Sequence, residues 1–88
     1  MNEGDRLEQL REEVSANDRA IVEAINRRLE LVAEIKRYKE SQGIAFLDPD
    51  REARMLDELR RANSGPLTDE GLEQIFHELL GLSKREAP

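Results

Sequence analysis

The sequence contains no cysteine, and its 88 residues include one histidine, one tyrosine and two phenylalanines. No disulfide can therefore stabilise the chain, and a structural zinc site has too few soft ligands. A domain of this length buries only about 60% of its unfolded surface, so a lone monomer would be marginally stable. Oligomerisation is the remaining way to enlarge the core, which we expect to be aliphatic and helical.

Long apolar runs are absent as well. No segment approaches the roughly 20 apolar residues of a membrane span, and Met1–Asp5 has neither the basic nor the apolar region of a signal peptide. We therefore expect a cytoplasmic protein with no membrane partner. The formal net charge of -6 disfavours nucleic-acid binding, which needs a positive surface. An anionic ligand would need a local cluster of arginine and lysine.

Residues 6–42 predict one long helix. Asp5 and Glu8 resemble a capping box at its start, and neither glycine nor proline interrupts the segment before Gly43. Such a helix would be about 55 Å long, whereas a compact chain of this size has a radius of gyration of about 12 Å. Its apolar stripe would be exposed unless a second copy of the chain covers it, which predicts a homodimer. The stripe consists of Leu7, Leu10, Val14, Ile21, Ala24, Ile25, Leu31, Val32 and Ile35.

A second helix is expected over residues 49–62, after a turn at Gly43. Asp48 can cap this helix, and Pro49 suits its first position because proline has no amide hydrogen to lose there. The turn sequence Asn63-Ser64-Gly65-Pro66 ends it.

A third helix is expected over residues 69–85. Thr68 can cap it, and Gly81 weakens the helical pattern without breaking it. With no internal repeat in the chain, residues 1–88 predict a single all-α domain of three helices.

Polar side chains occupy positions on the predicted helices where apolar ones belong. Arg28 lies within about 40° of Leu10, Val32 and Ile35 on the helical wheel, and Lys39 follows about 16 Å further along the axis. Cations facing a helical core are costly unless an anion compensates them. The pattern therefore implies either a buried carboxylate partner or an anionic ligand. Glu52 and Ser83 likewise fall on the apolar faces of the second and third helices.

Arg11 and His77 lie off these apolar stripes. Arg11 is about 100° from the stripe and about 25 Å along the axis from Arg28, so the two cannot share a small ligand within one chain. In an antiparallel dimer the partner chain's Arg11 could approach the site. His77 is expected to be solvated.

The ordered set of these residues resembles the small all-helical chorismate mutases over essentially the whole chain. Members of this family are intertwined homodimers whose six-helix bundle holds two equivalent sites. The resemblance rests on Leu10-Arg11, Arg27-Arg28, Ile35, Lys39, Asp48-Pro49-Asp50-Arg51-Glu52, Ile75-Phe76 and Ser83.

The resemblance implies a rearrangement of chorismate to prephenate by an intramolecular Claisen-type shift, without cofactor, metal or nucleophile. Arg28 and the partner chain's Arg11 would clamp the substrate carboxylates, with Arg51 and Ser83 assisting. Lys39 would bind the ether oxygen of the breaking bond, where negative charge develops.

The resemblance also assigns the ring hydroxyl of chorismate to Glu52, aided by the backbone at Asp48, whose side chain could instead serve only as a helix cap. Family members commonly carry glutamine four residues after the serine, where this chain has Ala87. Glu86 is no substitute, because an ionised carboxylate repels developing negative charge. A weak mutase activated by 3-deoxy-D-arabino-heptulosonate 7-phosphate synthase, as some small relatives are, would fit this C-terminus.

Two other functions compete with the mutase. Isochorismate pyruvate-lyase uses the same fold and a similarly placed lysine, although the adjacent Arg51 and Glu52 favour the mutase. A non-catalytic dimerisation or regulatory subunit would pair its polar stripe residues internally to fix the helix register. Internal pairing predicts that an anionic transition-state mimic does not raise the melting temperature, whereas a ligand site predicts that it does.

Overall fold

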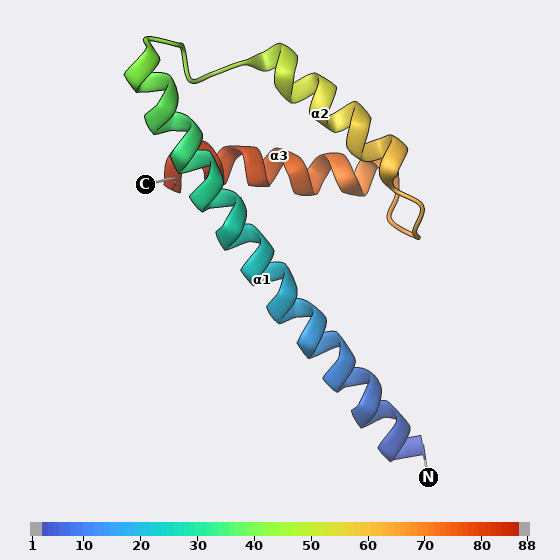
Figure 1. Ribbon diagram of the computed structural model, residues 1–88. Coiled ribbons are helices and arrows are strands. Elements are labelled where there is room, and N and C mark those ends of the chain that lie inside the picture. Colours follow the sequence, from blue (N-terminus) through green and yellow to red (C-terminus); the bar gives the residue numbers. More distant parts are fainter. Residues whose placement is uncertain (1–2, 87–88) are drawn as a thin grey trace.

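Three helices make up the computed structural model, which describes residues 3–86. They are α1 (Glu3–Gln42), α2 (Pro49–Ala62) and α3 (Asp69–Glu86), joined by short connections (Figure 1). The all-helical, three-helix architecture expected from the sequence is confirmed.

The start of α1 differs from the prediction. Asp5 lies inside the helix, which already includes Glu3, so Asp5 is not its N-cap. The segment before Asp5 contains no proline, and a single glycine costs a helix only about 1 kcal/mol. Acidic side chains near the positive end of the helix also favour its extension.

Local capping signals fix the other helix ends. After α1, Gly43 adopts a left-handed φ of 68°, and the Ile44 amide donates a hydrogen bond to the Lys39 carbonyl at 2.9 Å. The Asp48 side chain accepts a hydrogen bond from the Arg51 amide at 3.1 Å and so caps α2. Asp48 thus has the capping role that the sequence allowed for it.

The start of α3 is capped in the same way. Thr68 Oγ1 accepts a hydrogen bond from the Gly71 amide at 3.0 Å. The helix then continues through Gly81 to Glu86, as expected. Its last two turns therefore carry Ser83 towards α1.

α3 packs against both other helices. It crosses the C-terminal half of α1, while the N-terminal half of α1 projects away from the other two helices (Figure 1). The chain consequently extends over 62 Å with a radius of gyration of 17.3 Å, well above the value of about 12 Å for a compact chain of this length.

The core enclosed by one chain is small. Among the described residues, only Ala33, Leu72 and Ser83 are buried, with 1%, 4% and 5% of their surface exposed. The hydrogen bond and ion pair from Arg60 on α2 to Glu73 on α3, with Nη2 and Oε1 2.7 Å apart, join the outer ends of the two helices. The hydrogen bond to Glu73 raises the pKa of the Arg60 guanidinium.

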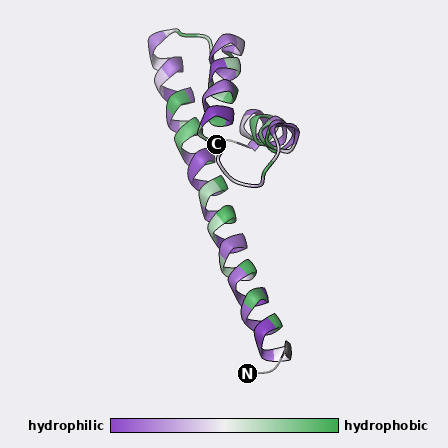
Figure 2. Cartoon of the chain, turned by 90° about the vertical axis from the view of Figure 1, so that its right-hand side faces the viewer, coloured by the Kyte–Doolittle hydropathy of each residue, from purple (hydrophilic) through white to green (hydrophobic). Residues whose placement is uncertain are grey.

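Hydrophobic residues recur along the projecting half of α1 (Figure 2), and several of them have large exposed side chains. Leu7, Leu10, Val14 and Ile21 are 48%, 40%, 59% and 49% exposed. Charged residues are interspersed among them, and none of the described helices has the length and apolar character needed to cross a membrane.

Candidate active site

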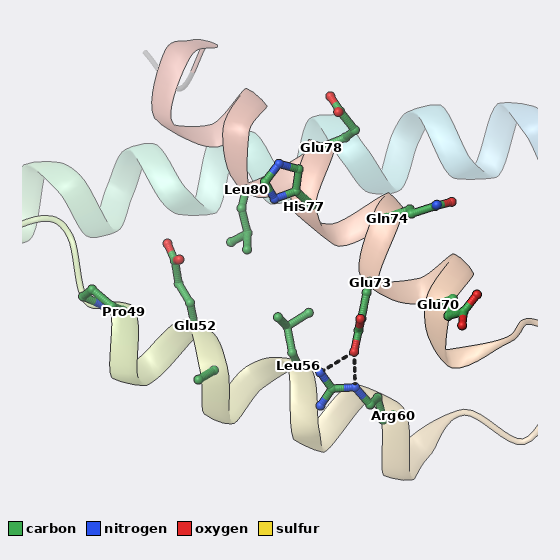
Figure 3. A pocket seen from close by; sticks show the side chains of 11 residues that line it. Pro49, Glu52, Leu56, Arg60, Glu70, Glu73, Gln74, His77, Glu78 and Leu80 are labelled. Carbon is green, nitrogen blue, oxygen red and sulfur yellow. Dashed lines mark hydrogen bonds and ion pairs between the residues drawn. The ribbon is translucent and has the colours of Figure 1, made fainter.

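A hollow of about 930 Å³ lies between α2 and α3 (Figure 3). Its floor includes Leu56, but the polar side chains around it are mainly carboxylates, and its arginine, Arg60, is already paired with Glu73. His77 borders this hollow and is exposed, in agreement with the expectation that it is solvated. Carboxylates outnumber cations in the lining of this hollow, which disfavours an anionic ligand.

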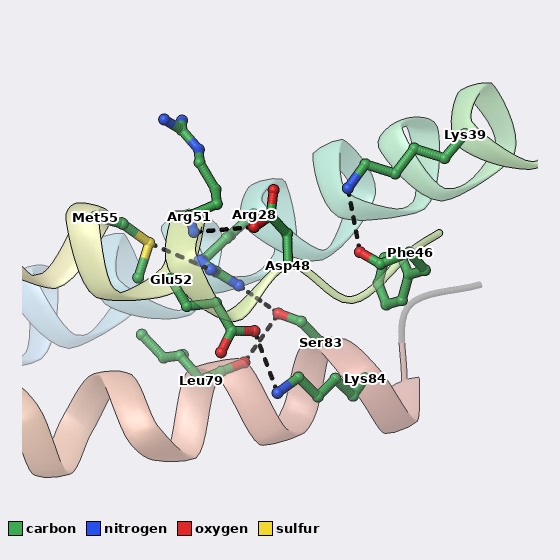
Figure 4. A network of polar contacts seen from close by, with 10 residues as sticks. All are labelled: Arg28, Lys39, Phe46, Asp48, Arg51, Glu52, Met55, Leu79, Ser83 and Lys84. Atoms are coloured by element: carbon green, nitrogen blue, oxygen red, sulfur yellow. Dashed lines mark hydrogen bonds and ion pairs between the residues drawn. The ribbon is translucent and has the colours of Figure 1, made fainter. Parts of the chain in front are cut away.

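A second pocket, of about 240 Å³, lies where the three helices meet (Figure 4). We call it the junction pocket. Six of the seven site residues predicted from the sequence line it, and only Arg11 does not, because it lies on the projecting half of α1. The lining residues are Arg28, Val32, Ile35, Lys39, Phe46, Leu47, Asp48, Arg51, Glu52, Met55, Leu80, Ser83 and Lys84.

Arg28 is held by α3 rather than by a carboxylate. Its Nη1 donates a hydrogen bond to Ser83 Oγ, and its Nη2 lies 4.0 Å from Met55 Sδ. Ser83 is buried and donates its own hydroxyl hydrogen to the Leu79 carbonyl at 2.9 Å. Within residues 3–86 Arg28 forms no ion pair, so neither Glu52 nor another described carboxylate of this chain compensates its charge. Most of its five donors remain available to a ligand.

Lys39 also lacks a carboxylate partner in the described part of the chain. Its Nζ donates a hydrogen bond to the Phe46 carbonyl at 3.1 Å, which holds the half-buried side chain against the connection between α1 and α2 (Figure 4). An ammonium group has three donors, so the contact with Phe46 leaves two for a ligand.

Glu52 forms an ion pair with Lys84, a residue that the sequence analysis did not single out. The Oε1 and Nζ atoms are 3.2 Å apart, and the two side chains are 31% and 43% exposed. Lys84 follows Leu80 by four residues, so both lie on the face of α3 that lines the pocket. That spacing is the signal by which the sequence could have identified Lys84.

Asp48 and Arg51 lie at the edge of the junction pocket. Asp48 is engaged in capping α2. The guanidinium of Arg51 points away from Arg28, Glu52 and Ser83 (Figure 4). Arg51 must therefore change rotamer before it can contact a ligand held by Arg28.

The charge of the junction pocket is opposite to that of the chain. Four cationic side chains (Arg28, Lys39, Arg51 and Lys84) and two carboxylates (Asp48 and Glu52) line it, a formal excess of two positive charges, whereas the whole chain carries -6. The described residues contain no cluster of three histidine or carboxylate side chains that could hold a metal ion. The pocket is therefore suited to a small organic dianion.

Comparison with known families gives one match that covers most of the chain. A family model described as chorismate mutase type II matches residues 10–87. The matched segment includes all seven predicted site residues, Arg11 among them.

Similar proteins and structures agree with this match. The chain is 31% identical to a bifunctional chorismate mutase/prephenate dehydratase of Stutzerimonas stutzeri, over 91% of this chain and 23% of that protein. It is 32% identical to a 4-amino-4-deoxychorismate mutase of Streptomyces venezuelae, over 86% of this chain and 70% of that protein. A chorismate mutase structure (form II) from Thermus thermophilus superposes with a TM-score of 0.82 and 36% identity, over 94% of this chain and 99% of that one. The chain thus spans about a quarter of the bifunctional relative and nearly the whole of the solved structure.

Proposed function

Because the chain belongs to the chorismate mutase type II family, we propose that it rearranges chorismate to prephenate on the route to phenylalanine and tyrosine. The ether carbon–oxygen bond breaks as a carbon–carbon bond forms, and no proton or group is transferred to the protein. The observation that carries the proposal is the excess of two positive charges in the junction pocket of a chain whose net charge is -6. Chorismate is a dianion, so the pocket complements its charge.

Arg28 is proposed to bind one substrate carboxylate. Its hydrogen bond to the buried Ser83 fixes the guanidinium before substrate arrives, so little side-chain entropy is lost on binding. A turn of the exposed Arg51 guanidinium towards the pocket would add a second contact. Holding the carboxylates selects the folded conformer in which the reacting carbons are close, and much of the rate enhancement would come from this orientation.

Lys39 is proposed to act on the breaking bond. Negative charge develops on the ether oxygen in the transition state, and an ammonium fixed beside it stabilises that state more than the ground state. The Phe46 carbonyl holds Nζ at 3.1 Å and thereby limits the reorganisation needed during the reaction.

Glu52 is proposed to accept a hydrogen bond from the ring hydroxyl of chorismate. Its Oε1 is engaged by Lys84, whereas Oε2 has no partner among the described residues. The backbone at Asp48, at the start of the same helix, would assist.

The working unit is proposed to be an intertwined homodimer with a six-helix bundle. One chain exposes 7109 Å², whereas a compact monomer of 10.1 kDa would expose about 5,300 Å². The excess exceeds the roughly 800 Å² that each partner buries in a standard interface. An apolar hollow of about 480 Å³ beside Leu31, Ile35, Tyr38 and Ile44 provides a surface for the partner's α1.

Dimerisation would also complete the site. If two α1 helices (Glu3–Gln42) pair antiparallel about their midpoints, residue 11 of one chain lies opposite residue 34 of the other. Residue 34 lies between Arg28 and Lys39 along the helix. The partner chain's Arg11 could then reach the open side of the junction pocket and bind the second carboxylate.

We further propose that the protein acts in the cytoplasm and that 3-deoxy-D-arabino-heptulosonate 7-phosphate synthase raises its activity. Two observations support an activating partner. Ala87 stands where the family commonly has a glutamine donor, and Leu47, in the connection beside the pocket, is 60% exposed. Adding the synthase should raise kcat/KM, and an unchanged value would contradict the proposal.

The deciding experiment follows the loss of chorismate absorbance and the formation of prephenate. Lys39→Ala should lower kcat by a factor of about 10² to 10³, as removal of one transition-state donor does. Lys36→Ala is the matched control, because it removes another lysine of α1 that does not line the junction pocket. The Lys36 ammonium lies over the Phe46 ring, 5.9 Å from its centre. Equal turnover in the wild type and Lys39→Ala would refute the proposed role. No turnover in any variant without an added partner would favour a partner-activated subunit or a non-catalytic dimerisation module.

A further inference from the structure

Lys84 occupies a position that affects what Glu52 can bind. The ion pair joins α3 to α2 at 3.2 Å, and both side chains line the junction pocket. The neighbouring Ser83 is 5% exposed and holds Arg28, so this turn of α3 is fixed relative to α1. The backbone of Lys84 is therefore held near the carboxylate by a well-packed turn of the fold.

A lone carboxylate prefers a cationic ligand group to a neutral one. An ammonium group adds a charge–charge attraction that a neutral hydroxyl cannot supply, so an unpaired Glu52 would hold an ammonium group more tightly than a hydroxyl. With Lys84 at 3.2 Å the charge of Glu52 is already compensated. A second cation at the same carboxylate would meet the repulsion of the Lys84 ammonium.

The similarity to a 4-amino-4-deoxychorismate mutase indicates which two substrates the charge of Glu52 could distinguish. The name of that enzyme's substrate denotes chorismate with an amino group in place of the hydroxyl at ring carbon 4. A simple alkyl amine is protonated at neutral pH, so the two substrates differ there by a full positive charge. This substituent is the one that Glu52 would contact under the proposed function.

We propose that Lys84 is a specificity-determining residue that makes the pocket select a substrate with a neutral hydroxyl at ring carbon 4 over one with an ammonium group. The inference rests on the proposed mutase function and on the role of Glu52 in it. Lys84 acts by neutralising Glu52 and by repelling the ammonium group.

The test compares kcat/KM for chorismate and for 4-amino-4-deoxychorismate in the same preparations. The wild type should favour chorismate, and Lys84→Gln should shift the ratio towards the amino substrate by about tenfold or more. Lys84→Arg keeps the positive charge and should preserve the wild-type ratio. Arg85→Gln removes the same charge from the next residue of α3, outside the pocket lining, and should also leave the ratio unchanged.

The outcomes separate this inference from the proposed function. Chorismate turnover by the wild type with an unchanged ratio in Lys84→Gln overturns the inference alone. Equal loss of both activities with a lower melting temperature assigns Lys84 a purely structural role and overturns it as well. Failure of the wild type to convert chorismate contradicts the proposed function, and the inference falls with it.

Discussion

The Arg28 guanidinium donates a hydrogen bond to the Ser83 hydroxyl and so joins the middle of α1 to the last turns of α3. Ser83 also donates to the Leu79 carbonyl at 2.9 Å. The hydroxyl is therefore fixed on one side by its own helix and on the other by the arginine. This contact links the packing of the fold to the position of Arg28, which is proposed to bind the substrate.

Replacement of Ser83 by alanine tests that link. Ser83→Ala removes the acceptor that orients Arg28, so the KM for chorismate should rise by roughly tenfold, the equivalent of one hydrogen bond to a charged group. Ser41→Ala is the matched control, because the Ser41 hydroxyl is exposed and, among residues 3–86, its hydrogen bonds are to the nearby Tyr38 carbonyl and the Gln42 side-chain amide. Steady-state kinetics of both variants measure the effect, and equal KM values would contradict the orienting role.

Ala33 tests the packing of the small core. Only 1% of its surface is exposed, so Ala33→Leu inserts three carbon atoms into a filled space and should destabilise the fold by about 1–3 kcal/mol. Ala16→Leu adds the same group at an exposed position of α1 and should change stability little. Thermal unfolding at one fixed protein concentration compares them, and a melting temperature of Ala33→Leu equal to that of the wild type would show that the site has room for leucine.

Ala87→Gln tests whether the C-terminus limits turnover. The position lies outside the described residues, but the family resemblance places a glutamine donor to the ether oxygen there. A second neutral donor to the developing charge should raise kcat by about tenfold. Chorismate depletion by the purified variant measures this, and Ala87→Glu should give no gain because a carboxylate cannot donate when ionised. An unchanged kcat in Ala87→Gln would place the limit on turnover elsewhere in the chain.

The helices could be predicted because their signals are local. Asp48 with Pro49 and Thr68 with its following acidic turn cap the helices that they precede, whatever the rest of the chain does. The helical periodicity of the sequence also predicted that Arg28 and Lys39 lie on one face of α1. In the structure both residues line the junction pocket.

Details set by tertiary contacts could not be read from the sequence. The pairing of Glu52 with Lys84 depends on the crossing of α2 and α3, and the outward direction of Arg51 depends on its rotamer. The start of α1 was misjudged because Asp5 is a good cap residue that the helix simply passes through. The role proposed for Arg11 requires a second chain, whose position relative to the first the sequence of one chain does not give.

Mixing two inactive variants tests whether Arg11 acts across a dimer. In a heterodimer of Arg11→Ala and Lys39→Ala chains, one site combines an intact Lys39 with the intact Arg11 of the other chain, and the second site has lost both. Random exchange of subunits makes half of the dimers heterodimers, so about one quarter of the wild-type activity should return. Each variant alone should remain nearly inactive, because every site in it lacks the same cation.

The control for this mixture pairs two variants that damage the same side of the site. Arg28→Ala and Lys39→Ala chains each lack a group that the pocket takes from its own chain. No heterodimer of these two can contain an intact site, so mixing them should restore nothing. Chorismate depletion after brief denaturation and joint refolding measures both mixtures. Recovery in neither mixture, although light scattering shows a dimer, would mean that Arg11 serves its own chain or none, because subunit exchange could then not assemble a complete site.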